Sequence, residues 1–397
     1  MSELQDPIVI VSAARTPMGG FQGELSNQTG AELGAAAISA ALSFGGIDAN
    51  IVDEVIMGCV LSAGQGQAPA RQASIKAGVP IAAAASTINK MCGSGMKAAM
   101  LAHDLILAGS ASVVVAGGME SMSNAPYLLP KARSGLRMGH GQLIDHMFLD
   151  GLEDAYEQGR LMGTFAEDCA EAYQFSREAQ DAFAIESLTR AQAAIRDGHF
   201  DKEITAVDVV AGKIRRRVDT DEQPGKARLE KIPTLRPAFR EGGTVTAANS
   251  SSISDGAAAL VIMRQSEAER LGLSPRGRIV GHSTFSNRPE RFATAPIGAM
   301  KKLSDRTGWS FDDVDLFEIN EAFAVVPMAA MQTLGLPHDK VNVNGGACAL
   351  GHPIGASGAR ILVTLLSALE EHGLTKGVAS VCIGGGEATA IAMERIQ

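Results

Sequence analysis

A cysteine with the surroundings of a nucleophile lies in the first quarter of the chain. Cys92 occupies a glycine-rich turn, residues 89–97, and apolar positions follow it at helical spacing, namely Met96, Met100, His103 and Leu107. Only a thiolate attacks a carbonyl carbon, and the unpaired N–H groups at a helix N-terminus stabilise such a charge. The pattern predicts a helix through about Gly109 with a reactive thiol at its start. The alternative is a small cysteine that merely packs beside the turn.

A second glycine-rich turn occurs in the C-terminal third. His352 lies in Gly351-His-Pro-Ile-Gly-Ala-Ser-Gly358, and an apolar helical run, 361–369, follows. Ser94-Gly-Met-Lys97 parallels Ser357-Gly-Ala-Arg360, and each helical run precedes a β-branched run that ends in glycines, at 113–118 and 378–386. The two segments resemble copies of one unit. An internal duplication would bring both turns to one pseudo-two-fold centre.

Two further polar residues end predicted strands. Cys382 closes a β-branched run before three glycines, where backbone can approach a ligand closely. Asn320 follows the alternating run 314–319. Taken singly, Asn320 is also a common turn former and Cys382 could be an inert buried thiol.

Together these segments resemble the thiolases from end to end. The matching segments are Ser12–Pro17, Ala70–Ala73, Met91–Gly95, Ala116–Ser123, Thr244–Ala247, Asp255–Ala258, Asn320–Ala324, Gly351–Gly358 and Cys382–Gly386. The resemblance implies a homo-oligomeric enzyme that makes or cleaves a carbon–carbon bond between acyl-CoA thioesters. It implies coenzyme A as substrate or product, with neither a metal nor a redox cofactor.

The resemblance also implies a role for each candidate catalytic residue. Cys92 would carry the acyl group, and His352 would take its proton. Cys382 would remove a proton from the methyl group of a second acetyl-CoA. His352 and a water held by Asn320 would stabilise the enolate, and the N–H groups of Cys92 and Gly384 would hold the tetrahedral oxyanion.

Positions that match the family's acyl and pantetheine pocket are present, but the pocket departs from many acetoacetyl-CoA-forming relatives. The matching positions are Met91, Leu152, Met162, Phe239, Ala247, Ser251, Ile253, Ala322 and Phe323. The departures are Leu161 before Met-Gly163, Phe292 in place of a methionine, and Glu387 after the last glycine. Phe292 either shortens the acyl pocket or merely repacks beside it.

The fold implied is α/β, with two pseudo-duplicated βαβαβαββ core domains in a five-layer αβαβα arrangement. We expect an N-terminal core in residues 1–120 with 251–270, an inserted loop domain in 121–250, and a C-terminal core in 271–397. The insertion contains a predicted helix from Ser176, its N-cap, to Asp197. It also contains the basic run 213–217, which is either a solvated edge strand or a contact for the CoA phosphates.

Composition excludes several classes of protein. The formal net charge of −9 provides no basic surface of the kind that nucleic-acid binders need. The five cysteines show neither metal-ligand spacing nor a disulfide framework, which indicates a reducing compartment. The sequence shows no run of apolar residues long enough to span a membrane and no signal before the first predicted strand. We therefore expect a cytoplasmic enzyme.

Two activities within the family remain open. Residues 131–145 resemble the loop through which short-chain biosynthetic members form tetramers, which favours a tetrameric acetyl-CoA acetyltransferase. The alternative is a 3-ketoacyl-CoA thiolase of broader chain length that serves fatty acid β-oxidation. A non-catalytic CoA-binding scaffold would be expected to lose one of the four candidate catalytic residues. A decarboxylating condensing enzyme would carry Cys-His-His instead of Asn320 and Cys382.

Overall fold

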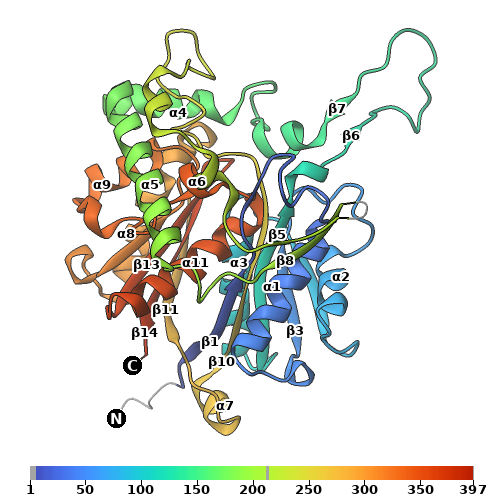
Figure 1. Ribbon diagram of the computed structural model, residues 1–397, viewed down its shortest axis with the longest axis vertical. Helices are drawn as coiled ribbons and strands as arrows, with labels where there is room; N and C mark the ends of the chain where they lie inside the picture. The colour runs from blue at the N-terminus through green and yellow to red at the C-terminus, as the bar shows by residue number, and fades with distance from the viewer. Residues whose placement is uncertain (1–5, 212–213, 397) are drawn as a thin grey trace.

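The computed structural model describes residues 6–211 and 214–396, and its centre is one long mixed sheet (Figure 1). Its strands lie in the order β12 (Leu316–Ile319), β13 (Lys376–Ile383), β14 (Glu387–Arg395), β11 (Gly277–Ser286), β1 (Ile8–Arg15), β10 (Ser254–Arg264), β5 (Val113–Ser121), β3 (Glu54–Gly58) and β4 (Ala84–Ile88). The short strand β2 (Gly19–Gly20) pairs with β10. Two half-sheets meet where β1 pairs with β11, with Val9 opposite Arg278 and Ile10 opposite Gly277.

Helices form three layers around the two half-sheets. On the N-terminal half, α1 (Gly30–Phe44) packs on β1, β5 and β10, and α2 (Pro69–Lys76) packs on β3 and β4. On the C-terminal half, α8 (Ala295–Thr307) covers β11, β13 and β14, and α9 (Val325–Leu334) packs on α8. Between the halves, α3 (Ser94–Leu107) and α11 (Ile354–Glu371) contact each other and strands of both. This arrangement confirms the five layers predicted.

The connectivity of the two halves repeats. The series β11, α8, β12, α9, α11, β13, β14 follows the order of β1, α1, β3, α2, α3, β5, β10. The inner strands β3–β5 and β12–β13 are parallel, and the returning strands β10 and β14 are antiparallel to them. Val341, bridged in parallel to Phe317, occupies the place that β4 has in the first half. The predicted duplication is therefore present in the fold.

The two central helices touch at glycines that the duplication places in equivalent positions. A Cβ on Gly95 would lie 2.7 Å from the Ala359 nitrogen, and one on Gly358 would lie 2.4 Å from the Met96 nitrogen. Only residues without a side chain permit this backbone approach. The helix after Cys92 forms as predicted, but Leu107 does not continue its buried face: Ile106 is buried and Leu107 is largely exposed, because the helix ends there.

The segment between β5 and β10 carries the remaining larger elements. A hairpin of β6 (Tyr127–Leu128) and β7 (Ile144–Asp145) extends away from the body at the upper right of Figure 1. The other elements are η3 (Phe148–Leu152), α4 (Met162–Tyr173), α5 (Arg177–Asp197), β8 (Val207–Ala211), β9 (Ile214–Val218), α6 (Glu222–Lys226) and η4 (Leu229–Thr234). Ser176 caps α5 as predicted. The limits chosen for the three domains stay a prediction.

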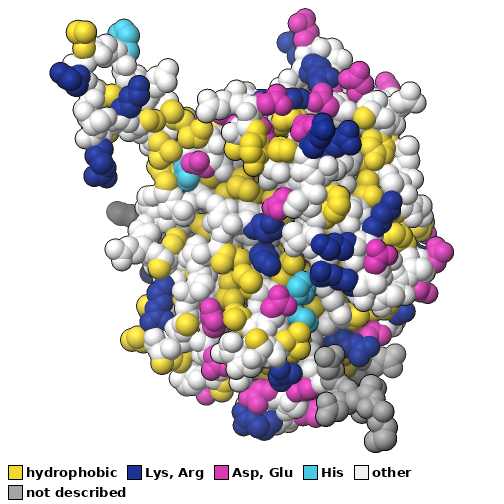
Figure 2. Space-filling model, turned by 180° about the vertical axis from the view of Figure 1, so that it is seen from behind, with side chains coloured by type: hydrophobic (Ala, Val, Ile, Leu, Met, Phe, Trp, Pro, Cys, Tyr) yellow, Lys and Arg dark blue, Asp and Glu magenta, His cyan; other side chains and the backbone are white. Residues whose placement is uncertain are grey.

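Short helical elements complete the chain. They are η1 (Ala49–Ile51), η2 (Met122–Asn124), α7 (Gln265–Arg270), η5 (Pro289–Thr294), η6 (Phe311–Asp313), η7 (His338–Lys340) and α10 (Ala347–Leu350). Across residues 6–211 and 214–396, no helix combines the length and the apolarity that crossing a membrane requires. On the face shown in Figure 2, basic and acidic side chains of the described residues are intermixed.

Candidate active site

The turn that carries Cys92 is held by its neighbours in the chain. Met91 has a left-handed backbone with a φ of 47°, which turns the chain sharply before α3. The Ser94 hydroxyl accepts a hydrogen bond from the Lys90 N–H at 2.8 Å and donates one to the Met91 carbonyl at 2.6 Å. Cys92 is half-buried at the end of this turn. The turn therefore fixes the thiol at the start of the central helix α3.

The thiol faces the glycine turn between β13 and β14. The backbone N–H groups of Gly384 and of Cys92 itself favour the thiolate and act to lower the pKa of the Cys92 thiol. Burial nevertheless dominates and raises the pKa of the Cys92 thiol to about 11. The resting thiol is therefore protonated, because the helix start and the two N–H groups do not offset the loss of solvent. The same two N–H groups are the donors that the family resemblance assigns to an oxyanion.

His352 lies in the turn before α11 and is 6% exposed. Burial, assisted by the Arg360 cation, lowers the pKa of His352 to about 3, so the imidazole is neutral at rest. Its Nδ1 lies 2.6 Å from the Ser357 hydroxyl, which also lies within donating distance, 2.9 Å, of the Pro353 carbonyl. Its Nε2 is buried and has no partner among the described residues. Cys92 and His352 do not form a resting ion pair.

Asn320 and Cys382 end neighbouring parallel strands and complete the group. The Asn320 amide nitrogen lies 3.4 Å from Nδ1 of His352, and its Oδ1 is buried without a partner among the described residues. Cys382 is buried at the end of β13, and burial followed by the nearby Cys92 thiol raises its pKa well above the usual value. A buried polar atom without a partner costs about 1–3 kcal/mol. A water would donate to Asn320 Oδ1, and a substrate oxygen or a water would satisfy His352 Nε2.

A buried carboxylate, Glu120, ties the two halves together behind these residues. It accepts hydrogen bonds from the N–H groups of Val60 at 3.0 Å, Leu61 at 3.0 Å and Gly355 at 2.8 Å. Gly355 is three residues after His352. Burial outweighs these bonds and raises the pKa of Glu120 to about 7. The sequence motif that contains Glu120 did not indicate a function for this residue, because its hydrogen-bond partners lie on distant segments.

Glu387, for which the sequence offered no explanation, forms an ion pair at the nucleophile turn. One carboxylate oxygen lies 2.5 Å from Lys90 Nζ, and the other accepts a hydrogen bond from the Ser286 hydroxyl at 2.8 Å. Burial acts to raise the pKa of Glu387, but these two partners outweigh it and the pKa lies below its usual value. The charged pair joins β14 to the residue two positions before Cys92.

Apolar residues from several elements surround the group. Met91, Leu152 and Ile253 pack with Cys92 against one cluster, which contains Val60, Leu61, Met122, Met147 and Ile354. Met162, at the start of α4, lies beside Gly384, since a Cβ on that glycine would be 3.7 Å from its terminal methyl. These four predicted pocket residues therefore lie around the thiol and the Gly384 turn.

Three of the predicted pocket residues are phenylalanines stacked edge to face. Phe323 lies 5.9 Å from Phe239 and 6.2 Å from Phe292, measured between ring centroids. Phe292 is 2% exposed and also contacts Phe165, at 6.4 Å. The Phe292 ring thus lies behind Phe323 in the core, in the same buried cluster as Cys382. Ala322 is buried, and its carbonyl accepts hydrogen bonds from the backbone N–H and hydroxyl of Ser251, each at 3.0 Å.

A cavity of about 340 Å³ adjoins the His352 turn. Its wall includes Ser252, whose carbonyl accepts the His352 N–H at 3.1 Å, and the predicted pocket residue Ala247. Its other lining residues are Ala184, Leu188, Gln223, Lys226, Ala227, Arg228, Lys231, Ile232, Leu235, Ala248, Cys348 and Ala349. The lining combines three cations, Lys226, Arg228 and Lys231, with many apolar residues, which suits a ligand that has a charged head and a neutral arm.

The basic run that the sequence analysis considered for phosphate contacts lies elsewhere. Arg215, Arg216 and Arg217 are exposed on the β8–β9 hairpin, where Arg216 pairs with Glu24 at 3.1 Å. None of these three arginines lines the cavity. Lys213 lies outside the described residues. The exposed-strand interpretation fits these arginines. The cations of the cavity are Lys226, at the end of α6, and Arg228 and Lys231 after it, and the sequence analysis missed them because other residues separate them.

Comparison with known proteins agrees with this geometry. The chain matches the thiolase N-terminal domain over residues 8–266 and the thiolase C-terminal domain over residues 273–395. It is 50% identical over 391 residues to an acetyl-CoA acetyltransferase of Cupriavidus necator, covering 98% of this chain and 99% of that protein. It is 51% identical over 390 residues to acetyl-CoA acetyltransferase 2 of Arabidopsis thaliana, covering 98% and 96%.

Solved structures show the same similarity in three dimensions. The crystal structure of the acetyl-CoA acetyltransferase of Bacillus anthracis aligns with a TM-score of 0.96 at 41% identity, over 98% of this chain and 99% of that one. A thiolase from Ascaris suum, crystallised in complex with coenzyme A, aligns with a TM-score of 0.93 at 41% identity, over 98% and 100%. Two thiolase domain matches together span the chain, and relatives are about half identical to it over their full length. The protein therefore belongs to the thiolase family.

Proposed function

We propose that the protein is an acetyl-CoA C-acetyltransferase, which condenses two acetyl-CoA into acetoacetyl-CoA and CoA and catalyses the reverse thiolysis. Full-length relatives at about half identity bear that name. The observation that carries the proposal is the convergence of two thiols, Cys92 and Cys382, with His352 and Asn320, whose Nε2 and Oδ1 atoms have no partner among the described residues. This set supplies a nucleophile, a base and polar groups for a thioester oxygen.

In the first half-reaction the Cys92 sulfur attacks the thioester carbon of acetyl-CoA. The unpartnered Nε2 of His352 accepts the thiol proton as the S–C bond forms, since the two groups are neutral at rest. The N–H groups of Cys92 and Gly384 donate to the oxyanion. Collapse of this intermediate expels the CoA thiolate, which takes the proton from His352. The product is acetyl-Cys92 and free CoA.

In the second half-reaction Cys382 acts as the base. Its thiol, protonated at rest, first transfers its proton to solvent, which returns it at the end of the cycle. The thiolate then removes a proton from the methyl group of a second acetyl-CoA, and the enolate carbon attacks the acetyl carbon of Cys92. The enolate oxygen accepts hydrogen bonds from Nε2–H of His352 and from a water held by Asn320. The C–C bond forms, the Cys92 sulfur leaves as a thiolate, and the proton on Cys382 reprotonates it. No metal or redox cofactor is needed to balance these steps.

The two half-reactions require opposite tautomers of His352, and Ser357 fits both. When Nε2 is the base, Nδ1 carries the hydrogen and donates to Ser357, whose hydroxyl turns to the Pro353 carbonyl at 2.9 Å. When Nε2–H is the donor, the Ser357 hydroxyl turns to Nδ1 at 2.6 Å. Rotation of one hydroxyl therefore supports either state of the imidazole.

The cavity beside His352 is the proposed site for coenzyme A. Lys226, Arg228 and Lys231 would face the phosphates of the nucleotide, and Ala247 and Ser252 would contact the pantetheine arm. Ser252 places this lining beside the His352 turn, since its carbonyl accepts the His352 N–H at 3.1 Å. The Ascaris suum thiolase, whose structure contains coenzyme A, has the same fold.

We further propose a homotetramer in the cytoplasm. The protruding hairpin carries exposed apolar side chains, including Met138, which is 98% exposed, and Leu143. Strand β4 lies at one end of the sheet order and leaves an edge for pairing. Exposed apolar groups and an open strand edge support association between copies. The five cysteines are free, which suits a reducing compartment.

The activity is tested by steady-state thiolysis on one preparation. Acetoacetyl-CoA should give a higher kcat/KM than a medium-chain 3-ketoacyl-CoA, with ping-pong initial-rate patterns. Cys92→Ser should lose nearly all turnover with both substrates while retaining the fold. A kcat/KM equal or higher for the medium-chain substrate would replace the proposal with the broader-range 3-ketoacyl-CoA thiolase. CoA binding without turnover by the wild-type chain would indicate a scaffold.

A further inference from the structure

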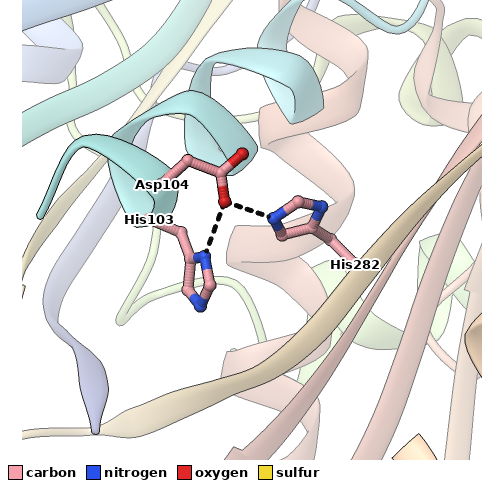
Figure 3. A group of neighbouring side chains, drawn as sticks. All are labelled: His103, Asp104 and His282. Atoms are coloured by element: carbon pink, nitrogen blue, oxygen red, sulfur yellow. Dashed lines mark hydrogen bonds and ion pairs between the residues drawn. The ribbon is translucent and has the colours of Figure 1, made fainter. Parts of the chain in front are cut away.

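Three side chains that could hold a metal ion meet on the surface, away from the candidate active site (Figure 3). His103 and Asp104 lie near the end of α3, and His282 lies on β11. One oxygen of Asp104 lies 3.1 Å from Nδ1 of His103 and 2.8 Å from Nε2 of His282. Both imidazoles point at that carboxylate, and their rings meet edge to face with centroids 5.1 Å apart.

The ligand atoms are spaced for a transition-metal ion. One nitrogen of His103, one oxygen of Asp104 and one nitrogen of His282 all lie within 4.8 Å of one another. Nitrogen and oxygen ligands lie about 2.0–2.2 Å from Zn²⁺ in a tetrahedral site, which sets them about 3.3 Å apart. Two separations, 3.1 and 2.8 Å, are near this value without an ion. The ligands stand on a helix and a strand, so little rearrangement is needed.

The two ring side chains are largely buried, whereas the carboxylate is accessible. The exposed side-chain fractions are 13% for His103, 15% for His282 and 50% for Asp104. An ion can therefore enter from solvent and keep a water as its fourth ligand. Two features lower the expected affinity for an ion. Nδ1 of His282 has no partner among the described residues that would orient the ring. The Arg306 guanidinium, which donates to the His282 carbonyl at 2.7 Å, brings a positive charge close to the site.

We propose that His103, Asp104 and His282 form a surface site for Zn²⁺ or a similar divalent transition metal that joins the two halves of the molecule. His103 and Asp104 belong to the N-terminal half, and His282 belongs to the C-terminal half. Asp104 is twelve residues beyond Cys92, or about 18 Å along a helix, so the ion does not touch the reacting groups. Its effect is to hold the far end of the nucleophile helix against β11.

Cobalt(II) is the probe, because its absorption distinguishes the ligands. The Cys92→Ser chain should bind one Co²⁺ with visible d–d bands and without the intense near-ultraviolet absorption of a cobalt thiolate. Zn²⁺ should displace the Co²⁺ and raise Tm. In the same background, Asp104→Asn and His282→Gln should bind Co²⁺ at least about tenfold more weakly and lose the rise in Tm. His140→Gln, in the exposed hairpin, is the matched control and should behave as its parent.

Each outcome decides for or against the site. Asp104→Asn keeps the size of a half-exposed side chain, so it should fold even if His282→Gln does not. Equal Co²⁺ affinity in the Asp104→Asn chain and its parent would overturn the proposal, as would a thiolate-type spectrum. Failure of the parent chain to bind Co²⁺ would show that the three residues form a hydrogen-bonded cluster alone.

Discussion

Replacing Phe292 by alanine tests whether the core behind the acyl site determines which acyl-chain length the enzyme prefers. The ring is 2% exposed and packs edge to face on Phe165 and Phe323. Removing a buried phenylalanine costs about 3–5 kcal/mol of unfolding free energy. The space left behind Phe323 should let that ring withdraw from the proposed pocket. Because an added methylene in an apolar pocket changes discrimination by about 1–3 kcal/mol, the preference for a longer acyl chain should rise roughly tenfold.

The assay is the ratio of kcat/KM for a six-carbon over a four-carbon 3-ketoacyl-CoA in thiolysis. Phe311→Ala is the control, since Phe311 packs on Phe317 against the same core cluster but belongs to η6, which precedes β12. The control should lose stability without changing the ratio. An unchanged ratio in a folded, active Phe292→Ala enzyme would refute the reasoning and show that Phe292 does not limit the acyl site.

Three further predictions concern the nucleophile and its partners. Alkylation of Cys92 by iodoacetamide in the free enzyme should keep accelerating with pH up to about 11, and a plateau at neutral pH would instead reveal a resting thiolate–imidazolium pair. Glu387→Gln and Lys90→Met should each slow acylation of Cys92, and a double-mutant cycle should give a coupling free energy of about 1 kcal/mol. Additive effects would show that the ion pair does not contribute to acylation. Ser357→Ala should lower kcat about tenfold, a loss of about 1.4 kcal/mol, while KM changes little; an unaltered kcat would remove Ser357 from the tautomer scheme.

Much of the fold could be predicted because its signals are local. The parallel Ser-Gly turns at 94 and 357 predicted a duplication, and Gly95 and Gly358 are where α3 and α11 meet. The four candidate catalytic residues each end a strand or begin a helix, so one pseudo-symmetric centre accounts for all of them. Their assigned roles stay predictions until they are measured.

The remaining features depend on contacts that no local pattern records. Lys90 and Glu387 are 297 positions apart, and Asp104 and His282 are 178 apart. The protonation of Cys92 at rest depends on how completely the fold excludes water, so the sequence could indicate a nucleophile but not its raised pKa. Phe292 was identified as a departure from relatives, yet only packing shows that it lies behind Phe323.

The central claim is that Cys92 carries the acetyl group between the two half-reactions. The most direct measurement is mass spectrometry of peptides after brief exposure to acetyl-CoA with a ¹³C-labelled acetyl group. The account predicts the labelled acetyl mass on the peptide containing Cys92, both in the wild-type enzyme and in Cys382→Ala, because transfer from acetyl-CoA to Cys92 precedes the step assigned to Cys382. A label only on another cysteine, or its disappearance in Cys382→Ala, would contradict the account.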